Sequence, residues 1–424
     1  MANSAGRPIS IVYFCNERQR GGVEEHILTL LRGLNRERFQ PHLVCPPELA
    51  DRLAGDLPDG LGLTRLTLRG LRDTDAMSAL ARLFRRLRPR ILHSHLFYAS
   101  LFASPIARLC GVPVTVETPH LRELWRHGWK AHRAVDRIAS CWVDAFIAVS
   151  AANAAFLQVG KGIPGRKIHL VRNGADLSRF DPHRRPPAEL YARYHIPPGA
   201  PVLVALARLE PQKGHALLLK AMPAIRTRIP EVHLVCVGEG RLRGQLEVQC
   251  RELGLDDCVH FPGYQSAIAD HLALATATVL PSLYEGLPLA AIESLAAGRP
   301  VLASRVDGTP EVVRHQENGL TFPSGNWEAI AEAVITALSD RARCRLWGSH
   351  GRRWVERHFS QEAQIRQTEA VYLAACARHA RAAGRPFLVS RGFAAAAPNP
   401  AKTQMAGAEM AEVSSVAERQ RVAS

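Results

Sequence analysis

Short apolar runs alternate along the chain with segments whose apolar residues recur every three to four positions. The first run is residues 9–14, ISIVYF, whose β-branched and aromatic residues are typical of a buried strand. A polar loop follows and ends in Gly21-Gly22. The next segment, from about Val23 to Leu34, has the apolar spacing of an amphipathic helix. A strand, a glycine loop and a helix therefore begin the chain.

The same alternation continues to about residue 150. Further strands are predicted at residues 41–45, 91–95, 113–118 and 145–150. Helices are predicted at residues 76–89, 97–111 and through the 130s, the first of these ended by Pro89. Strands that alternate with helices form a parallel sheet covered on both faces, so the first half is expected to be an α/β domain.

A second α/β region follows a proline-rich stretch between Asp181 and Pro201, which is interpreted as a linker. Its strands are predicted at residues 201–209, 232–238, 259–263, 277–282, 300–305 and 319–322, and its helices at 215–228, 244–254, 269–277, 288–298 and 327–338. Further helical segments occupy residues 341–383. Ligands of such sheets bind beyond the carboxyl ends of the strands, so a cleft between two facing domains is the expected site.

The predicted domains have the following bounds: a flexible N-terminus at 1–7, a first domain at 8–182, a linker at 183–200, a second domain at 201–357, a C-terminal helix at 358–384 and a disordered tail at 385–424.

Composition narrows the class of protein. The chain has 424 residues, 47% of them hydrophobic, and a net charge of +15. Most of the positive excess lies in residues 1–182, which favours an anionic partner: a nucleic acid, a phospholipid surface or a phosphorylated substrate. Nine cysteines without a CxxC pair argue against a disulfide framework and fit a reducing cytoplasm. We see neither a secretory signal nor an apolar run long enough to span a bilayer.

Residues 281–300 carry the most informative chemistry. A predicted strand ends at Leu280, and the loop after it carries Glu285 and Gly286. Pro288 suits the first position of a helix, whose opening N–H groups can bind a phosphate. Glu293 lies about one and a half turns further on, where its carboxylate can accept hydrogen bonds from the paired hydroxyls of a ribose. Either glutamate alone is also compatible with an ordinary β-α surface.

A second candidate segment follows the first strand of the second domain. It contains Arg208, whose planar guanidinium matches phosphate oxygens, and Lys213, a compact point charge. Two cations beyond a strand end suit a diphosphate leaving group, although a solvated basic loop explains them equally well.

Together these segments resemble the retaining glycosyltransferases of the GT-B fold, family 4. The family's E-x7-E motif is matched by Glu285 and Glu293, and its arginine and lysine by Arg208 and Lys213. Its glycine loop is similar to residues 21–24, and its "NG.D" turn to residues 173–176. The resemblance covers residues 8 to about 380. It implies two Rossmann-like domains with parallel sheets, the first for the acceptor and the second for a nucleotide sugar, and final helices that return to the first domain.

The resemblance also implies roles for particular residues. Arg208 and Lys213 would neutralise the departing diphosphate, Glu285 would face the transferred sugar, and Glu293 would bind the ribose. Gly22 would let the backbone approach the distal phosphate. The remaining donor-binding residues would be Gly286, Leu287, Pro288 and Leu289, through their backbone, and Asn173.

Histidines are the remaining candidates in the first domain. His93 and His95 alternate on a strand and so face the same side. Relatives carry a functional histidine in a "T-x-H" context after the next strand, which Thr118-Pro119-His120 resembles. His120 would contact the donor sugar or orient the acceptor. A metal site of His93, His95 and His120 is possible by residue type but lacks a motif, so we expect no metal.

The predicted function is a metal-independent retaining glycosyltransferase of cell-surface glycan, lipopolysaccharide or glycolipid synthesis. The donor would be a nucleotide sugar, with a UDP-sugar favoured and no further cofactor, and the acceptor a glycan or a lipid-linked molecule. The alternatives are a nucleotide-sugar epimerase of the same fold and a non-catalytic glycan- or lipid-binding protein.

The location expected of such an enzyme is cytoplasmic, with the inner face of the plasma membrane as a candidate site of attachment. Arginines 85, 86, 88 and 90, and the tryptophan-containing segment 124–130, offer a surface for an anionic membrane, although a solvated basic face explains them equally well. No motif for reading nucleic acid accompanies the charge.

Overall fold

The computed structural model describes residues 8–70, 72–121 and 132–384. They form two compact units. Among the described residues, unit 1 comprises those up to Arg172 and those from Glu362 to 384, and unit 2 comprises Asn173–Gln361. The predicted flexible N-terminus at 1–7, the predicted tail at 385–424 and the segment 124–130 lie outside the described residues.

The division between the units falls after Arg172, ahead of the predicted linker. Residues 183–200 belong to unit 2, where they include the short helix α7 (Ala188–Arg193). Arg184 forms an ion pair with Asp270 at 2.6 Å, and the Tyr194 hydroxyl shares a hydrogen bond with His271 at 2.9 Å. The prolines thus mark an irregular segment that is fixed to unit 2 by side-chain contacts, which composition alone does not show.

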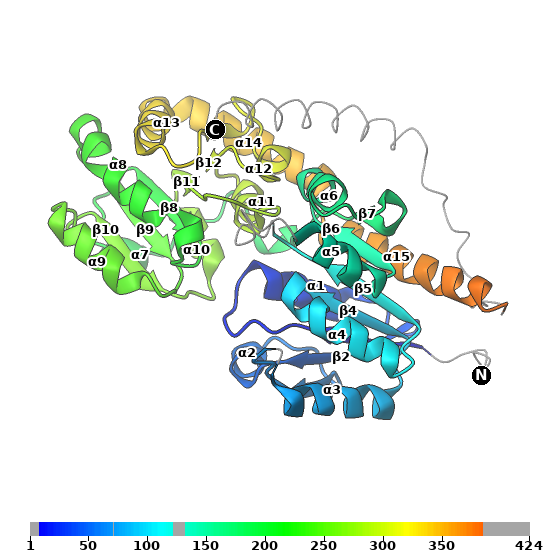
Figure 1. Cartoon of the computed structure of the whole chain (residues 1–424). Coiled ribbons are helices and arrows are strands. Elements are labelled where there is room, and N and C mark those ends of the chain that lie inside the picture. Colours follow the sequence, from blue (N-terminus) through cyan, green and yellow to red (C-terminus); the bar gives the residue numbers. More distant parts are fainter. Residues whose placement is uncertain (1–7, 71, 122–131, 385–424) are drawn as a thin grey trace. The chain divides into compact units, whose positions relative to one another are not determined.

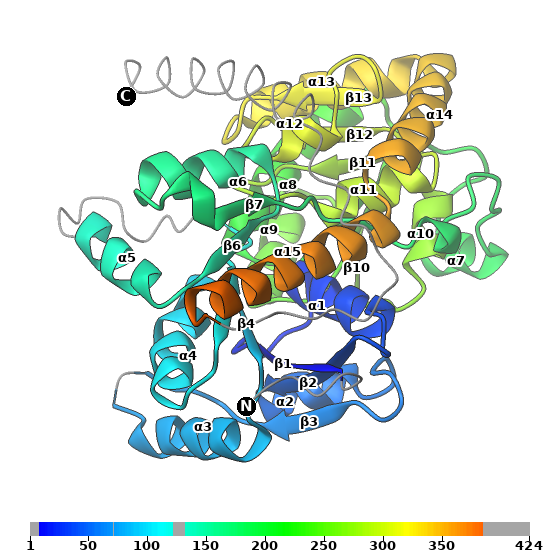
Figure 2. The ribbon, with the colours of Figure 1, turned by 90° about the vertical axis from the view of Figure 1, so that its right-hand side faces the viewer.

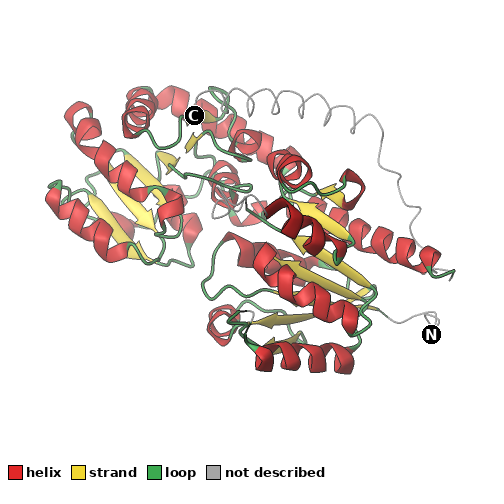
Figure 3. Cartoon of the chain, in the orientation of Figure 1, coloured by secondary structure: helices red, strands yellow, loops and turns green. Residues whose placement is uncertain are grey.

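Unit 1 contains a seven-stranded parallel sheet (Figures 1 and 3). Its strand order is β3-β2-β1-β4-β5-β6-β7. The strands are β1 (Ile9–Phe14), β2 (Phe39–Cys45), β3 (Gly62–Arg65), β4 (Ile91–His95), β5 (Val114–Thr118), β6 (Ala145–Ala148) and β7 (Ile168–Leu170).

Helices cover both faces of this sheet. They are α1 (Gly22–Gly33), α2 (Pro47–Leu53), α3 (Thr74–Leu87), α4 (Phe97–Leu109), α5 (His132–Cys141), α6 (Ala151–Ala155) and α15 (Gln361–Ala382), with a π-helical turn at Phe156–Gly160 and a 3-10 turn at Gly165–Lys167. One buried cluster joins the sheet to α1, α2 and α15, and another joins it to α3 and α4. Figure 2 shows α15 in orange. Its Tyr372 hydroxyl lies 2.8 Å from that of Tyr13 in β1.

Unit 2 contains a six-stranded parallel sheet with the order β10-β9-β8-β11-β12-β13. The strands are β8 (Val202–Leu206), β9 (His233–Val237), β10 (Val259–Gly263), β11 (Ala277–Leu280), β12 (Val301–Ser304) and β13 (Gly319–Phe322). The other helices are α8 (His215–Arg228), α9 (Arg243–Glu252), α10 (Ile268–Leu274), α11 (Leu289–Ala296), α12 (Thr309–Val312), α13 (Trp327–Ser339) and α14 (Arg341–His358), with 3-10 turns at Leu177–Arg179 and Pro211–Lys213. The two predicted parallel sheets are therefore confirmed.

Both sheets reverse their strand order at one point. In unit 1 the reversal lies between β1 and β4, and in unit 2 between β8 and β11. In open parallel sheets, the connections leave in opposite directions at such a point, and ligands typically bind there, beyond the carboxyl ends of the two strands. Most candidate residues of the sequence follow these strands, whereas His120 follows β5 and Asn173 follows β7. Among the described helices, none combines the length and apolar character needed to cross a membrane.

Candidate active site

The reversal point of unit 2 brings a lysine and a glutamate together. Lys213 ends the 3-10 turn after β8, and Glu285 lies in the loop after β11. The Lys213 ammonium lies 2.5 Å from Glu285 Oε1, and the Ser282 hydroxyl donates to the same oxygen at 2.7 Å. Glu285 is 7% exposed. Its second oxygen, Oε2, accepts no hydrogen bond from any residue that the structure describes, so it remains available to a ligand hydroxyl.

Gly214 makes this ion pair possible. Its φ of +68° lies in the left-handed region that favours glycine, and a Cβ there would lie 2.1 Å from the carbonyl oxygen of Pro281. The chain after Lys213 therefore passes directly against the start of the glutamate loop. Any side chain at position 214 would push the two loops apart.

Neighbouring polar groups hold the loop at residues 281–288. The side chain of Gln212 donates to Tyr284 O at 2.9 Å, and its backbone carbonyl accepts from Leu283 N at 2.7 Å. Asn173 is buried and donates through Nδ2 to Leu287 O at 3.2 Å. Asn173 therefore fixes the loop, while the donor contact predicted for it stays a prediction.

Arg208 lies between β8 and the 3-10 turn and is half-buried. Its guanidinium forms no ion pair or hydrogen bond with the residues that the structure describes. Burial raises the pKa of Tyr284, and the nearby positive charge of Arg208 acts against that rise. Arg208 therefore lies within electrostatic reach of the glutamate loop and has its donors available for an anion.

The start of α11 adds backbone N–H donors beyond the carboxyl ends of β8 and β11, where Lys213 and Glu285 lie. The helix begins at Leu289, and Pro288 is its N-cap rather than its first residue as the sequence predicted. The N–H groups of Gly286, Leu287, Leu289 and Ala290 have no acceptor within the described part of the chain. Such amides at a helix N-terminus attract the oxygens of a phosphate. Glu293 lies one turn further along α11 and is partly buried.

The reversal point of unit 1 gathers three buried histidines from three elements. They are His26 on α1, His95 at the end of β4 and His120 beyond β5. His95 Nδ1 and His120 Nε2 share a hydrogen bond at 2.9 Å, and the rings of His26 and His120 have centroids 4.7 Å apart. Burial lowers the pKa of His95 and of His120 well below its usual value, so both imidazoles are neutral near pH 7.

His120 also has an unusual backbone. Its φ is +60°, in the left-handed region that non-glycine residues rarely adopt, and it is only 5% exposed. Backbone strain of this kind concentrates at functional sites, because the surrounding structure must impose it. This strained backbone favours His120 as a functional residue, and its role stays a prediction.

His93 faces the same side of β4 as His95, as its alternation predicted, and their ring centroids lie 4.2 Å apart, but its ring nitrogens are bonded elsewhere. Its two ring nitrogens bond to the hydroxyls of Tyr372 on α15 and of Thr118, at 2.6 and 2.8 Å. The three side chains whose ligand atoms lie within 4.8 Å of one another include His26 in its place. His26 was not among the predicted site residues, although it lies three residues after Val23 on the predicted apolar face of the first helix, where a polar side chain is a usable signal.

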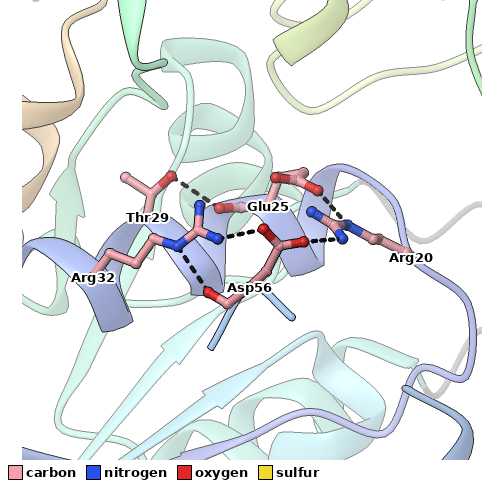
Figure 4. A network of polar contacts seen from close by, with 5 residues as sticks. All are labelled: Arg20, Glu25, Thr29, Arg32 and Asp56. Atoms are coloured by element: carbon pink, nitrogen blue, oxygen red, sulfur yellow. Dashed lines mark hydrogen bonds and ion pairs between the residues drawn. The ribbon is translucent and has the colours of Figure 1, made fainter. Parts of the chain in front are cut away.

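The glycine loop of unit 1 is fixed by the ion pairs that Figure 4 shows. Arg20, directly before Gly21, contacts Glu25 at 2.6 Å and Asp56 at 2.5 Å, and Arg32 contacts the other oxygen of Asp56 at 2.6 Å. Burial would raise the pKa of Asp56, but hydrogen bonds from the two arginines outweigh it and lower that pKa. Gly22 is exposed at the first turn of α1. The loop therefore has a defined shape, and its predicted phosphate contact stays a prediction.

Two parallel sheets with polar groups at their reversal points are compatible with a two-domain glycosyltransferase, and comparison with known proteins identifies the family. Residues 20–179 match the family model "Glycosyltransferase Family 4", and residues 189–354 match "Glycosyl transferases group 1". The chain is 33% identical over 264 residues to a GDP-mannose-dependent α-(1-6)-phosphatidylinositol monomannoside mannosyltransferase of Mycobacterium tuberculosis. That alignment covers 59% of this chain and 67% of the relative. A glycogen synthase of the same organism is 30% identical, over 69% of this chain and 70% of its own.

Solved structures agree on the fold. The Anabaena protein HepE, in complex with UDP-glucose, superposes with a TM-score of 0.73 at 18% identity, over 86% of this chain and 100% of its own. A sucrose-phosphate synthase of Thermosynechococcus elongatus gives a TM-score of 0.72 at 22% identity, over 88% and 100%. The chain belongs to the group 1 glycosyltransferases and is a glycosyltransferase of the GT-B fold. The predicted family and the predicted fold are therefore confirmed.

Proposed function

We propose that this enzyme moves a glycosyl group from a nucleotide-diphosphate sugar to an acceptor hydroxyl and keeps the anomeric configuration. The observation that carries the proposal is the arrangement after β8 and β11. It combines the Lys213–Glu285 ion pair, the uncommitted guanidinium of Arg208 and the amides at the start of α11. These groups match a sugar diphosphate: hydroxyls for the carboxylate, and two phosphates for the cations and amides.

Electrostatics explains how the departure of the diphosphate would be stabilised. When the bond between the sugar C1 and the phosphate oxygen breaks, negative charge grows on the departing diphosphate. Arg208, Lys213 and the amides from Gly286 onwards are fixed donors that stabilise this charge without reorganising. The ion pair holds the ammonium of Lys213 in one place, so it is oriented before the donor arrives.

The sugar end of the reaction depends on Glu285 and His120. Oε1 of Glu285 is occupied by Lys213 and Ser282, which makes this carboxylate a weak nucleophile and leaves Oε2 for a sugar hydroxyl. In the proposed step the acceptor oxygen forms its bond to C1 on the face that the diphosphate leaves, and a phosphate oxygen takes the acceptor proton. Positioning then supplies most of the rate. Neutral His120 offers a hydrogen bond to the sugar or the acceptor.

A UDP-sugar is the proposed donor, and Glu293 the proposed ribose-binding residue. The solved relative HepE is described with UDP-glucose, while the M. tuberculosis relative is named for GDP-mannose, so GDP-mannose is the competing donor. No metal or further cofactor enters the proposal. The acceptor would be a glycan or a lipid-linked molecule of cell-surface glycan, lipopolysaccharide or glycolipid synthesis.

A donor screen tests this function. UDP-, GDP-, ADP- and dTDP-sugars are added to the full chain, and melting temperature and nucleotide release are measured with and without candidate acceptors. A donor that binds only the folded enzyme raises the melting temperature. Lys213→Ala should lower turnover by orders of magnitude. Lys220→Ala removes the same charge from α8, where Lys220 lies over the Trp327 ring, and should leave turnover unchanged. Release of nucleotide without an acceptor, together with a free epimerised sugar, would indicate an epimerase instead.

The proposed acceptor side includes contact with an anionic membrane at the inner face of the plasma membrane. Arg85, Arg86 and Arg88 at the end of α3 are exposed and have no ion-pair partner in the described ranges, and large apolar side chains such as Leu109 and Ile138 are exposed in the same unit. A triple R85S/R86S/R88S variant should lose co-sedimentation with anionic liposomes. Matched removal of the exposed arginines 228, 251 and 353 in unit 2 should not. Binding that ignores lipid charge would contradict the membrane contact.

A further inference from the structure

Asp307 adopts a backbone conformation that normally belongs to glycine. It lies in the turn between β12 and α12, and its φ is +41°. Most L-residues avoid this region because Cβ crowds the backbone, and aspartate and asparagine are the residues that tolerate it best. Strained residues of this kind persist only where the surrounding structure imposes the conformation, which often happens at functional sites. The contacts of the Asp307 side chain therefore show what the strain serves.

The Asp307 carboxylate contacts the backbone of the candidate catalytic glutamate. Glu285 N donates to Asp307 Oδ2 at 3.0 Å. The carboxylate of the same glutamate is held separately, by Lys213 and Ser282. The peptide before Cα and the carboxylate beyond it are therefore both fixed, which restricts the position of Oε2.

The other polar contacts of this loop act on different atoms. Gln212, Asn173 and Ser324 donate to carbonyl oxygens of Tyr284, Leu287 and Ser282. Asp307 is an acceptor, and it bonds the amide of Glu285 itself. The next amides, of Gly286 and Leu287, have no acceptor in the described part of the chain. Asp307 thus engages the amide of Glu285 and leaves the amides of Gly286 and Leu287 available to an anionic ligand.

We propose that Asp307 is a positioning residue for the glycosyl transfer. It reaches across from the neighbouring β-α turn, fixes the peptide of Glu285, and so sets where Oε2 meets the donor sugar. The left-handed backbone at position 307 aims the carboxylate at this amide. The proposal deepens the function proposed above and rests on Glu285 facing the transferred sugar.

Three substitutions separate the carboxylate from the backbone conformation. Asp307→Asn keeps an acceptor oxygen and tolerates positive φ, so we expect kcat within about threefold of the parent enzyme. Asp307→Gly keeps the conformation but loses the acceptor, so kcat should fall about tenfold with little change in donor KM and no loss in melting temperature. Asp307→Ala loses both, so its kcat and its melting temperature should both fall.

Two controls test whether the effect passes through Glu285. Gln316 also has a positive φ, of +64°, in the same unit, so Gln316→Gly changes a comparable backbone and should leave kcat unchanged. In a Glu285→Gln background, Asp307→Gly should reduce kcat much less than it does alone, because the positioned carboxylate has already been removed.

Hydrogen exchange gives a readout that does not depend on turnover. Peptides that contain residues 281–288 should exchange faster in Asp307→Gly than in the parent, and Asp307→Asn should restore protection. Unchanged kcat and unchanged exchange in Asp307→Gly would overturn the proposal. So would an Asp307→Asn variant as impaired as Asp307→Gly with a raised donor KM, because Asp307 would then bind ligand by its charge. If the parent turns over no nucleotide sugar, the proposed function fails, and the exchange comparison still decides the role of Asp307.

Discussion

The enzyme has two candidate edges, which are the carboxyl ends of β1 and β4 in unit 1 and those of β8 and β11 in unit 2. They share one backbone arrangement and differ in chemistry. Each lies where a parallel sheet reverses its strand order. In unit 1 the groups there are the buried imidazoles of His26, His95 and His120. In unit 2 they are a buried ion pair, an uncommitted guanidinium and helix amides. The sheet fixes where a ligand binds, while the loops decide which ligand.

Burial produces opposite outcomes at the two edges. No carboxylate of the described residues bonds to His93, His95 or His120, and burial lowers the pKa of all three. Lys213 and Glu285 are also poorly exposed, but each meets an opposite charge at 2.5 Å. The edge in unit 2 therefore suits an anionic diphosphate, and the edge in unit 1 suits neutral hydroxyls. The following experiments test this contrast.

The largest expected effect follows loss of the cation. Lys213→Ala should lower kcat/KM about 10³-fold, because it removes a fixed charge from the leaving diphosphate and leaves Glu285 buried without its partner. Initial rates of nucleotide release measure this, with Lys220→Ala as the control for charge. Activity equal to the parent would remove Lys213 from the mechanism and would erase the charged character of the edge in unit 2.

Glu285→Gln should have the next largest effect. The amide keeps the shape and its oxygen can still accept from Ser282, but the charge opposite Lys213 is lost, so we expect about a 10²-fold fall in kcat. Circular dichroism verifies that the variant is folded. The matched control is Glu231→Gln at an exposed position before β9, which should retain full activity. A folded Glu285→Gln variant as active as this control would contradict the assignment.

The neutral histidines predict how stability depends on pH. Their pKa values in the folded state lie below the unfolded value of about 6.5, so the unfolded chain binds more protons as the pH falls through and below 6.5. Stability should therefore decrease on acidification below that pH. Melting curves between about pH 7.5 and 5 measure the slope. His95→Gln should flatten it, whereas the exposed His183→Gln should not; equal slopes would mean that His95 does not contribute.

The smallest effect is expected in the glycine loop of unit 1. Asp56→Asn removes the ion pairs with Arg20 and Arg32, and we expect it to lower the free energy of unfolding by about 0.5–1 kcal/mol. The loss is small because the side chain of Asp56 is 38% exposed. Asp51→Asn, whose pair with Arg65 is more exposed, is the control and should change stability less. Urea unfolding measures both, and a larger loss in the control would reverse this ranking.

The periodic parts of the sequence predicted most strands and helices. The strands at Ile9–Phe14 and Ile91–His95 and the helix at Trp327–Ser339 follow the predicted patterns closely. The short edge strands β3 and β7 were not predicted, because three or four residues are too few to establish a period. The attachment of the proline-rich segment to unit 2 was not visible either, because it depends on Arg184 and Tyr194 meeting partners distant in the sequence.

The sequence by itself determined the two α/β halves and the spacing of Glu285, Glu293, Arg208 and Lys213, because periodicity and local motifs require only neighbours along the chain. The tertiary structure decided which of these groups meet. It paired Lys213 with Glu285 across 72 positions, added His26 to the histidines and placed Asp307 against the Glu285 amide. Contacts of this kind depend on strand order and on backbone angles such as φ at Asp307, and a linear pattern specifies neither.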